Sequence, residues 1–158
     1  MRNESGRSLV EILGVLAIIG IISIAGIAGY KLAVYRYTAS RIIDTTNKYA
    51  FIVFERCRAV YDSHSTSLQS IDNCTKNTPG VPKFSEANLG IPPDGLLEEG
   101  ILFNRVSKGS DSNTHIIQTT LQFKTKDHCL AVKYMQNIQN GCRQTSAPYT
   151  LSFETRQN

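Results

Sequence analysis

The side chains of this 158-residue chain that are best suited to chemistry are four cysteines and three histidines. The cysteines form an even set with no C-x-x-C spacing, which argues against a structural zinc site or a thioredoxin-like redox motif. Four cysteines allow three disulfide pairings, and their spacing leaves all three open. The cysteines are Cys57, Cys74, Cys129 and Cys142.

The histidines show no catalytic arrangement. His64, His115 and His128 fall in separate predicted elements. His128 is adjacent to Cys129, but neighbouring residues on a helix point in different directions, so no nucleophile–base pair is indicated. A Gly-rich phosphate loop and an acid pair at a catalytic spacing are also missing from the sequence. We therefore expect no enzymatic activity, no cofactor and no metal site.

The charge of the chain does not favour nucleic-acid binding. The formal net charge is +4, and the 17 lysines and arginines are spread along the chain with no run longer than two. Nucleic-acid binders usually gather such residues on one face. We expect no specific nucleic-acid partner.

The element that dominates the sequence is an uncharged apolar segment, Ile12–Tyr30. At 1.5 Å per residue its length as a helix is about 28 Å, close to the hydrocarbon thickness of a bilayer. Cleaved secretory signals have a shorter apolar core, although residues 25–29 resemble a small-residue cleavage site. The segment predicts one membrane-spanning helix, and a simple uncleaved anchor is the plainest interpretation.

The helical pattern continues beyond the apolar segment. Apolar or semi-apolar residues recur at steps of three and four, and no Gly or Pro interrupts residues 31–61. We predict one helix from about Ser8 to Tyr61, in which residues 7–30 span the membrane and residues 31–61 pack against a globular head. A coiled coil is less favoured because no strict heptad is sustained. The predicted packing positions are Tyr35, Ala39, Ile42, Ile43, Thr46, Ala50, Val53, Cys57 and Val60.

The head, residues 62–158, is predicted to begin with a loop over residues 62–100, which holds four of the five prolines. Alternating or apolar runs then predict antiparallel strands, with a turn at residues 108–113. A short helix is predicted between the last two strands, from Lys126 to about Gln136, with Thr125 or Asp127 near its start. The fold class is α+β, with a sheet of three or four strands on the long helix. The predicted strands are Ile101–Val106, Thr114–Lys124 and Tyr149–Glu154, and Leu130, Tyr134 and Ile138 are expected to face the sheet.

A polar motif directly precedes the apolar segment. It reads Gly6-Arg7-Ser8-Leu9-Val10-Glu11. A carboxylate at the mouth of an apolar helix is unfavourable unless it reaches lipid headgroups or finds a cation. Cleavage after Gly6 would create such a cation, the α-amine of Arg7, four residues from Glu11.

This motif resembles the processing signal of the type IV pilin family, and the resemblance covers residues 1–35. It implies a pilin-like fold and a leader, Met1–Gly6, removed by a prepilin peptidase that also N-methylates Arg7. It further implies that Glu11 registers each new subunit in a filament. The first mature residue of the family is usually apolar, whereas here it is Arg7, whose guanidinium could itself neutralise Glu11. The proline common in the family's apolar helix is absent.

The resemblance also implies a location and partners. The precursor would cross the bacterial inner membrane once, with a cytoplasmic N-terminus and a periplasmic head. An inner-membrane assembly platform, driven by a partner ATPase, would move it into a filament of identical or related subunits. Disulfides are expected in such a head. Cys129–Cys142 resembles the carboxyl-terminal disulfide loop of many pilins, and Cys57–Cys74 would tie the end of the long helix to the loop.

Two alternatives remain open beside a major or minor pilin. The first is a pseudopilin of a type II secretion system, whose amino-terminal third has the same pattern. Some pseudopilin heads bind calcium through an acidic loop, and the only acidic cluster of this chain, Asp94, Glu98 and Glu99, makes a weak site. The second is an uncleaved membrane-anchored binding domain, which predicts no cleavage at Gly6.

Overall fold

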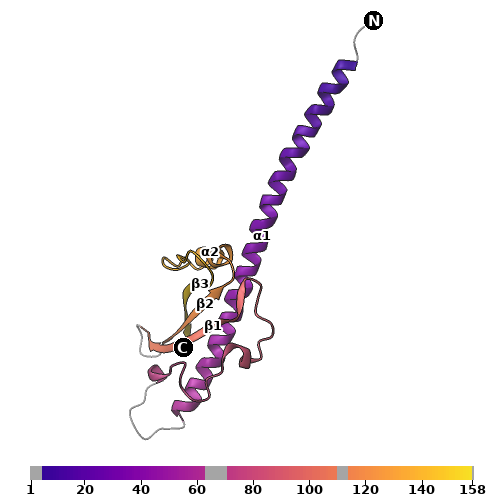
Figure 1. Cartoon of the computed structure of the whole chain (residues 1–158). Helices are drawn as coiled ribbons and strands as arrows, with labels where there is room; N and C mark the ends of the chain where they lie inside the picture. Colours follow the sequence, from indigo (N-terminus) through magenta and orange to yellow (C-terminus); the bar gives the residue numbers. More distant parts are fainter. Residues whose placement is uncertain (1–4, 63–70, 110–113, 158) are drawn as a thin grey trace. The chain divides into compact units, whose positions relative to one another are not determined.

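The computed structural model describes residues 5–62, 71–109 and 114–157, with the backbone alone for residues 5–8 and 62. One long apolar helix and a small antiparallel sheet confirm the predicted α+β class (Figure 1). The chain divides into two compact units, Met1–Tyr35 and Arg36–Asn158. The elements are α1 (Ser5–Asp62), the 3-10 helices η1 (Ile71–Asn73) and η2 (Phe84–Ala87), β1 (Leu96–Lys108), β2 (His115–Phe123), α2 (Lys126–Met135) and β3 (Tyr149–Gln157).

Helix α1 extends slightly beyond the predicted bounds, Ser8 and Tyr61, at both ends. From Arg36 onward it buries one face, as the three- and four-residue periodicity predicts. Tyr49 and Phe54 are also buried on this face, although they are not among the predicted packing positions. The predicted positions that are buried are Ala39, Ile42, Thr46, Ala50, Val53 and Cys57.

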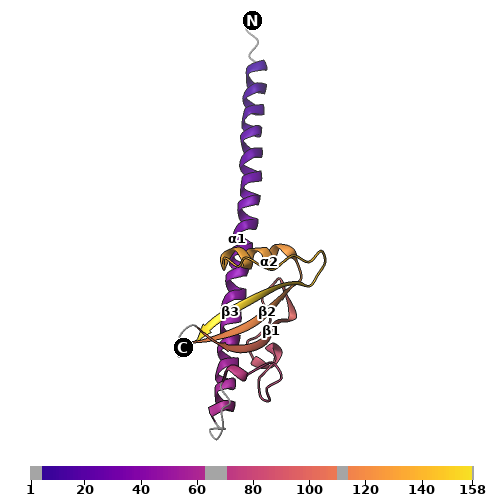
Figure 2. The same cartoon turned by 90° about the vertical axis from the view of Figure 1, so that its left-hand side faces the viewer.

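The sheet has the order β1-β2-β3, and both of its pairings are antiparallel. Buried residues alternate with more exposed ones along β2 and β3, so the sheet places one face on the core. That face covers the part of α1 that belongs to the second unit (Figures 1 and 2). The hydroxyl of Thr155 on β3 donates a hydrogen bond to the Asn47 side-chain oxygen on α1, at 3.1 Å.

Strand β1 begins at Leu96, inside the predicted loop and five residues before the predicted Ile101. Leu96 pairs with Phe123 and Ile101 with Leu121, so the residues between them form a bulge. Gly100 lies in this bulge, where an added Cβ would be 2.7 Å from the Leu97 carbonyl oxygen. The sequence conceals this start because the bulge breaks the alternation of buried and exposed residues.

Helix α2 packs against β2 and β3, and Leu130 and Ile138, two of the three residues expected to face the sheet, are partly buried against the core. Cys129 and Val132 are its buried residues, whereas Tyr134, expected to face the sheet, is 77% exposed. The Cys129–Cys142 disulfide fixes the buried face, with the two Cα atoms 5.9 Å apart. Since Tyr134 is five residues beyond Cys129, it lies about 140° away around the helix.

Both disulfides that we expected are present, and the described residues hold no free cysteine. Cys57 on α1 is bonded to Cys74, which follows η1. The residues after Cys74 lie along the outer edge of β1, where Val106 N–H donates to the Cys74 carbonyl and Lys76 N–H to the Asn104 carbonyl. This disulfide therefore fastens the end of α1 to the edge of the sheet.

Candidate functional site

The predicted processing site lies at the start of α1. Gly6 and Arg7 are within the first helical turns, whereas residues 1–4 of the predicted leader lie outside the described residues. Glu11 follows one turn later, and its side chain is exposed. The residues on either side of it, Val10 and Ile12, are exposed apolar side chains. Glu11 therefore stands at the beginning of an apolar surface, and the next charged residue in the sequence is Lys31.

The apolar surface surrounds the helix. Every side chain from residue 9 to residue 34 is exposed, including the large apolar ones. The hydroxyl of Ser23 donates a hydrogen bond to the Ile19 carbonyl, at 2.7 Å, so this polar group is satisfied by its own helix. By length and composition, α1 can cross a membrane. Exposed apolar surfaces of this extent are typical of protein–protein or membrane interaction sites.

The histidines lie apart where the structure describes them. His115 on β2 places its Nδ1 atom 3.2 Å from Asp72 Oδ1 and its ring 5.6 Å from that of Phe54. The Nδ1 atom of His128 on α2 is 2.6 Å from the Thr125 hydroxyl. His64 falls outside the described residues. His115 thus connects β2 with η1 and α1, whereas the Thr125–His128 contact is local to the first turn of α2.

The acidic cluster is spread over the start of β1. Asp94, Glu98 and Glu99 are all exposed. Within the described part of the chain, no group of three or more His, Cys, Asp or Glu side chains is placed to hold a metal ion.

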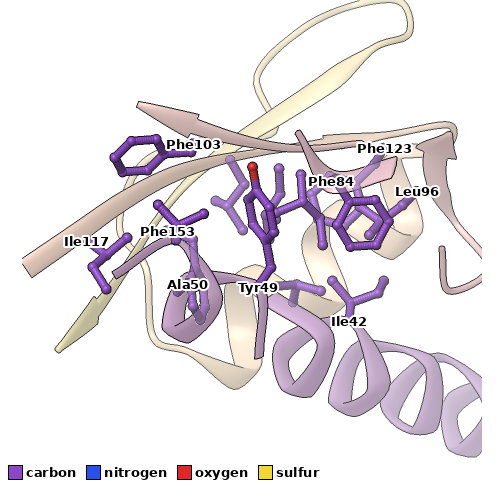
Figure 3. Packing of buried hydrophobic residues seen from close by; sticks show 14 of the residues in the cluster. Ile42, Tyr49, Ala50, Phe84, Leu96, Phe103, Ile117, Phe123 and Phe153 are labelled. Atoms are coloured by element: carbon purple, nitrogen blue, oxygen red, sulfur yellow. The ribbon is translucent and has the colours of Figure 1, made fainter. Parts of the chain in front are cut away.

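A pocket of about 560 Å³ opens beside β1 and η2. Apolar side chains that include Tyr49, Phe84 and Ile101 line it, and Lys76, Lys83, Glu86 and Glu99 are also in its wall. Figure 3 shows Tyr49 and Phe84 side by side, with ring centroids 5.7 Å apart in an edge-on arrangement.

Tyr49 connects this pocket wall to α1. Its hydroxyl donates a hydrogen bond to the Pro82 carbonyl oxygen, at 2.9 Å. Burial, together with the carboxylates of Glu99 and Glu86, raises the pKa of Tyr49 to about 12. The hydroxyl therefore remains protonated and able to donate throughout the physiological range.

Sequence reasoning missed this pocket. Tyr49 lies three residues after Thr46 and four before Val53, so the helical period could have identified it as buried. Phe84 gives no such signal, since it lies in a polar stretch with no periodicity.

A second pocket, of about 480 Å³, lies along the beginning of β3. Ile138, Gly141, Thr150, Phe153 and Glu154 are among the residues that line it.

The chain matches no family model, no curated protein and no solved structure.

Proposed function

We propose that this chain is a major or minor subunit of a type IV pilus, cleaved after Gly6, N-methylated at Arg7 and assembled into a filament. The observation that carries the proposal is the exposed apolar surface of residues 9–34, which begins next to Glu11 and directly follows the Gly6-Arg7 motif. A precursor would cover this surface with lipid. A filament would cover it with the same surface of its neighbours.

Glu11 sets the axial position of each subunit when lipid around the apolar helix is replaced by neighbouring subunits. In a bilayer its carboxylate lies at the mouth of the apolar helix, where it reaches headgroups. In a filament that position has no headgroups, so the carboxylate needs a cation from the protein. Cleavage after Gly6 supplies one as the α-amine of Arg7, on the same chain or on the neighbour. A subunit out of register would bury Glu11 without this partner, which is strongly unfavourable.

The proposed location follows from the same features. The single apolar helix fits a bacterial inner-membrane precursor with a cytoplasmic N-terminus and a periplasmic head. The Cys57–Cys74 and Cys129–Cys142 disulfides support an oxidising compartment for the head. The proposed partners are a prepilin peptidase, an inner-membrane assembly platform and the neighbouring filament subunits. The proposed role is structural rather than enzymatic.

The first test is the intact mass and amino-terminal sequence of the protein from cells that carry a prepilin peptidase. We expect an end at Arg7 with one added methyl group. Gly6→Leu should leave the leader in place, because a larger side chain crowds the cleavage site. Ser5→Ala is the matched control and should be processed normally. An end at Met1 in the unaltered chain would contradict the proposal and favour the uncleaved anchor.

The same cells also separate the pilus from the pseudopilus. A pilus subunit should appear in surface filaments under the electron microscope. A processed chain that never reaches the surface would favour the pseudopilin of a type II secretion system instead.

A second prediction concerns Glu11. Glu11→Gln should leave cleavage unchanged but lower filament yield by about tenfold or more, because removing one partner of a buried charge pair leaves the other charge unpaired and costs about 2–5 kcal/mol. Glu55→Gln removes an exposed carboxylate from the same helix and is the matched control. Normal filament yield with Glu11→Gln would refute the assembly role of this residue.

A further inference from the structure

The stretch at the end of the apolar segment combines tyrosines with basic residues. This tyrosine–basic segment, residues 30–37, is part of α1. Three of the seven tyrosines of the chain lie in it, together with one lysine and one arginine. Neither the apolar surface nor Glu11 accounts for these polar side chains. The sequence of the segment is Tyr30-Lys31-Leu32-Ala33-Val34-Tyr35-Arg36-Tyr37.

The polar side chains of this segment are available on the surface of the helix. Tyr30 is 72% and Tyr37 66% exposed, and Lys31 and Arg36 are exposed as well. Since Lys31 and Arg36 are five residues apart, they lie about 140° apart around the helix. A single flat partner would meet only one of these two sides. A medium that surrounds the helix meets both.

The two basic residues have no acidic neighbour along the helix. The sequence has no acidic residue between Glu11 and Asp44, and Asp44 forms an ion pair with Lys48, at 2.7 Å. Among the residues that the structure describes, neither Lys31 nor Arg36 forms an ion pair. Basic residues usually gather on the cytoplasmic side of a membrane, so the proposed topology gives no reason for two on the head side. Their charges fit an anionic partner outside the chain.

The position of the segment matches the second boundary of a bilayer. Glu11 and Lys31 are 20 residues apart, which is about 30 Å along a helix, the thickness of the hydrocarbon core. Residues 30–37 then cover about 10 Å, enough to pass through a headgroup region about 5–7 Å deep. Tyrosine is enriched at this level, because its ring is apolar and its hydroxyl is polar. Lysine and arginine side chains extend from it toward the lipid phosphates.

We propose that residues 30–37 form an interfacial anchor that binds the headgroups of anionic phospholipids. The inference rests on the proposed function, in which α1 crosses a membrane before assembly. The tyrosine rings lie among the headgroups, and Lys31 and Arg36 pair with lipid phosphates on two sides of the helix. The anchor fixes the axial depth of α1. It thereby holds Glu11 at the opposite boundary of the bilayer, with the Gly6–Arg7 bond outside the hydrocarbon core.

A single tryptophan tests the anchor, because the chain contains none. The full chain with Tyr30→Trp is reconstituted into vesicles with equal fractions of phosphatidylcholine and phosphatidylglycerol, one of which is brominated near its headgroup. Each basic residue strengthens the attraction to an anionic surface about fivefold. Brominated phosphatidylglycerol should therefore quench the tryptophan at least about twofold more strongly than brominated phosphatidylcholine. Equal quenching by the two lipids would overturn the inference.

Removal of charge identifies the groups responsible. Lys31→Gln with Arg36→Gln in the Tyr30→Trp chain should make quenching by the two lipids equal. Lys48→Gln with Arg56→Gln is the matched control and should keep the preference, because it removes one exposed lysine and one exposed arginine from the same helix outside the anchor. A preference that survives the loss of both basic residues of the anchor would overturn the inference.

A second probe separates this inference from the proposed function. Ile21 is in the middle of the apolar segment, so in a helix that crosses the bilayer Ile21→Trp should be quenched by lipids brominated deep in their acyl chains. Deep quenching there without a lipid preference at residue 30 would overturn the anchor and leave the membrane precursor standing. Absence of deep quenching would contradict both.

Two further outcomes come from cells. Equal quenching in vesicles, combined with loss of surface filaments when Lys31 and Arg36 are replaced by glutamine, would assign these residues to contacts between subunits and overturn the anchor. A lipid preference in a chain that retains Met1 in cells would support the anchor and contradict prepilin processing.

Discussion

Tyr49 shows how one side chain can join the long helix to the head. Its side chain is 2% exposed, its ring meets that of Phe84, and its hydroxyl reaches the Pro82 carbonyl. These contacts hold the segment around η2 on α1. Tyr49 and Phe84 are also among the residues around the 560 Å³ pocket.

Tyr49→Phe should lower the free energy of unfolding by about 1 kcal/mol near pH 7, because it leaves the Pro82 carbonyl without its donor. Chemical denaturation of the full chain in detergent, followed by circular dichroism, would measure the loss. Tyr37→Phe removes an exposed hydroxyl from the same helix and should change stability by much less. Equal effects of the two substitutions would contradict the role of the Tyr49 hydrogen bond.

The raised pKa of Tyr49 adds a pH dependence to the same variant. The folded chain holds this proton to about pH 12, whereas an unfolded tyrosine releases it near pH 10. The contribution of Tyr49 to stability is therefore fully present below pH 10 and decreases as pH rises toward 12, by about 1.4 kcal/mol per pH unit. Tyr49→Phe should show a shallower loss of stability above pH 10 than the unaltered chain.

At the scale of elements, the Cys129–Cys142 disulfide closes a loop formed by α2 and the residues that follow it. The helix ends at Met135, and Asn137, Gly141 and Cys142 have positive φ as the chain turns back toward β3. The Cys142 N–H then donates to the Thr150 carbonyl, at 2.9 Å. The loop after α2 is therefore held at Cys142 both by the disulfide to Cys129 and by the hydrogen bond to Thr150 at the start of β3.

Replacing Cys129 and Cys142 with serine should lower the free energy of unfolding by about 3 kcal/mol, the loop-closure effect for a ring of this size. Denaturation of the full chain would measure this loss. Non-reducing peptide mapping of the unaltered chain should show Cys129 joined to Cys142. A Cys57–Cys142 peptide would contradict the pairing.

Elements with a regular period could be predicted from the sequence, and those defined by distant partners could not. The bounds of α1, β2 and α2 lie within a few residues of expectation, because each shows its own periodicity. The early start of β1 is defined by the pairing of Leu96 with Phe123, and Cys129 on the buried face of α2 is bonded to Cys142. Neither partner lies within the sequence window that a local pattern uses.

At the scale of the whole molecule, the apolar helix could be identified from the sequence because its residues are contiguous, and the proposed processing motif directly precedes it. The pocket is different, because it joins Tyr49, Phe84 and Ile101 from three segments far apart in the chain. Only the folded head brings them together.

The glycines of the apolar helix have a consequence for the number of neighbours it can accept. Gly14, Gly20 and Gly26 follow one another at six-residue intervals, and a Cβ added at any of them would meet nothing within 4 Å. Packing within this chain therefore does not require them to be glycine. At 3.6 residues per turn, each successive glycine is rotated by about 120°, so the three notches point in three directions. A helix pair needs notches on one side only. In the filament that we propose, these three glycines would allow close neighbours on three sides of the helix.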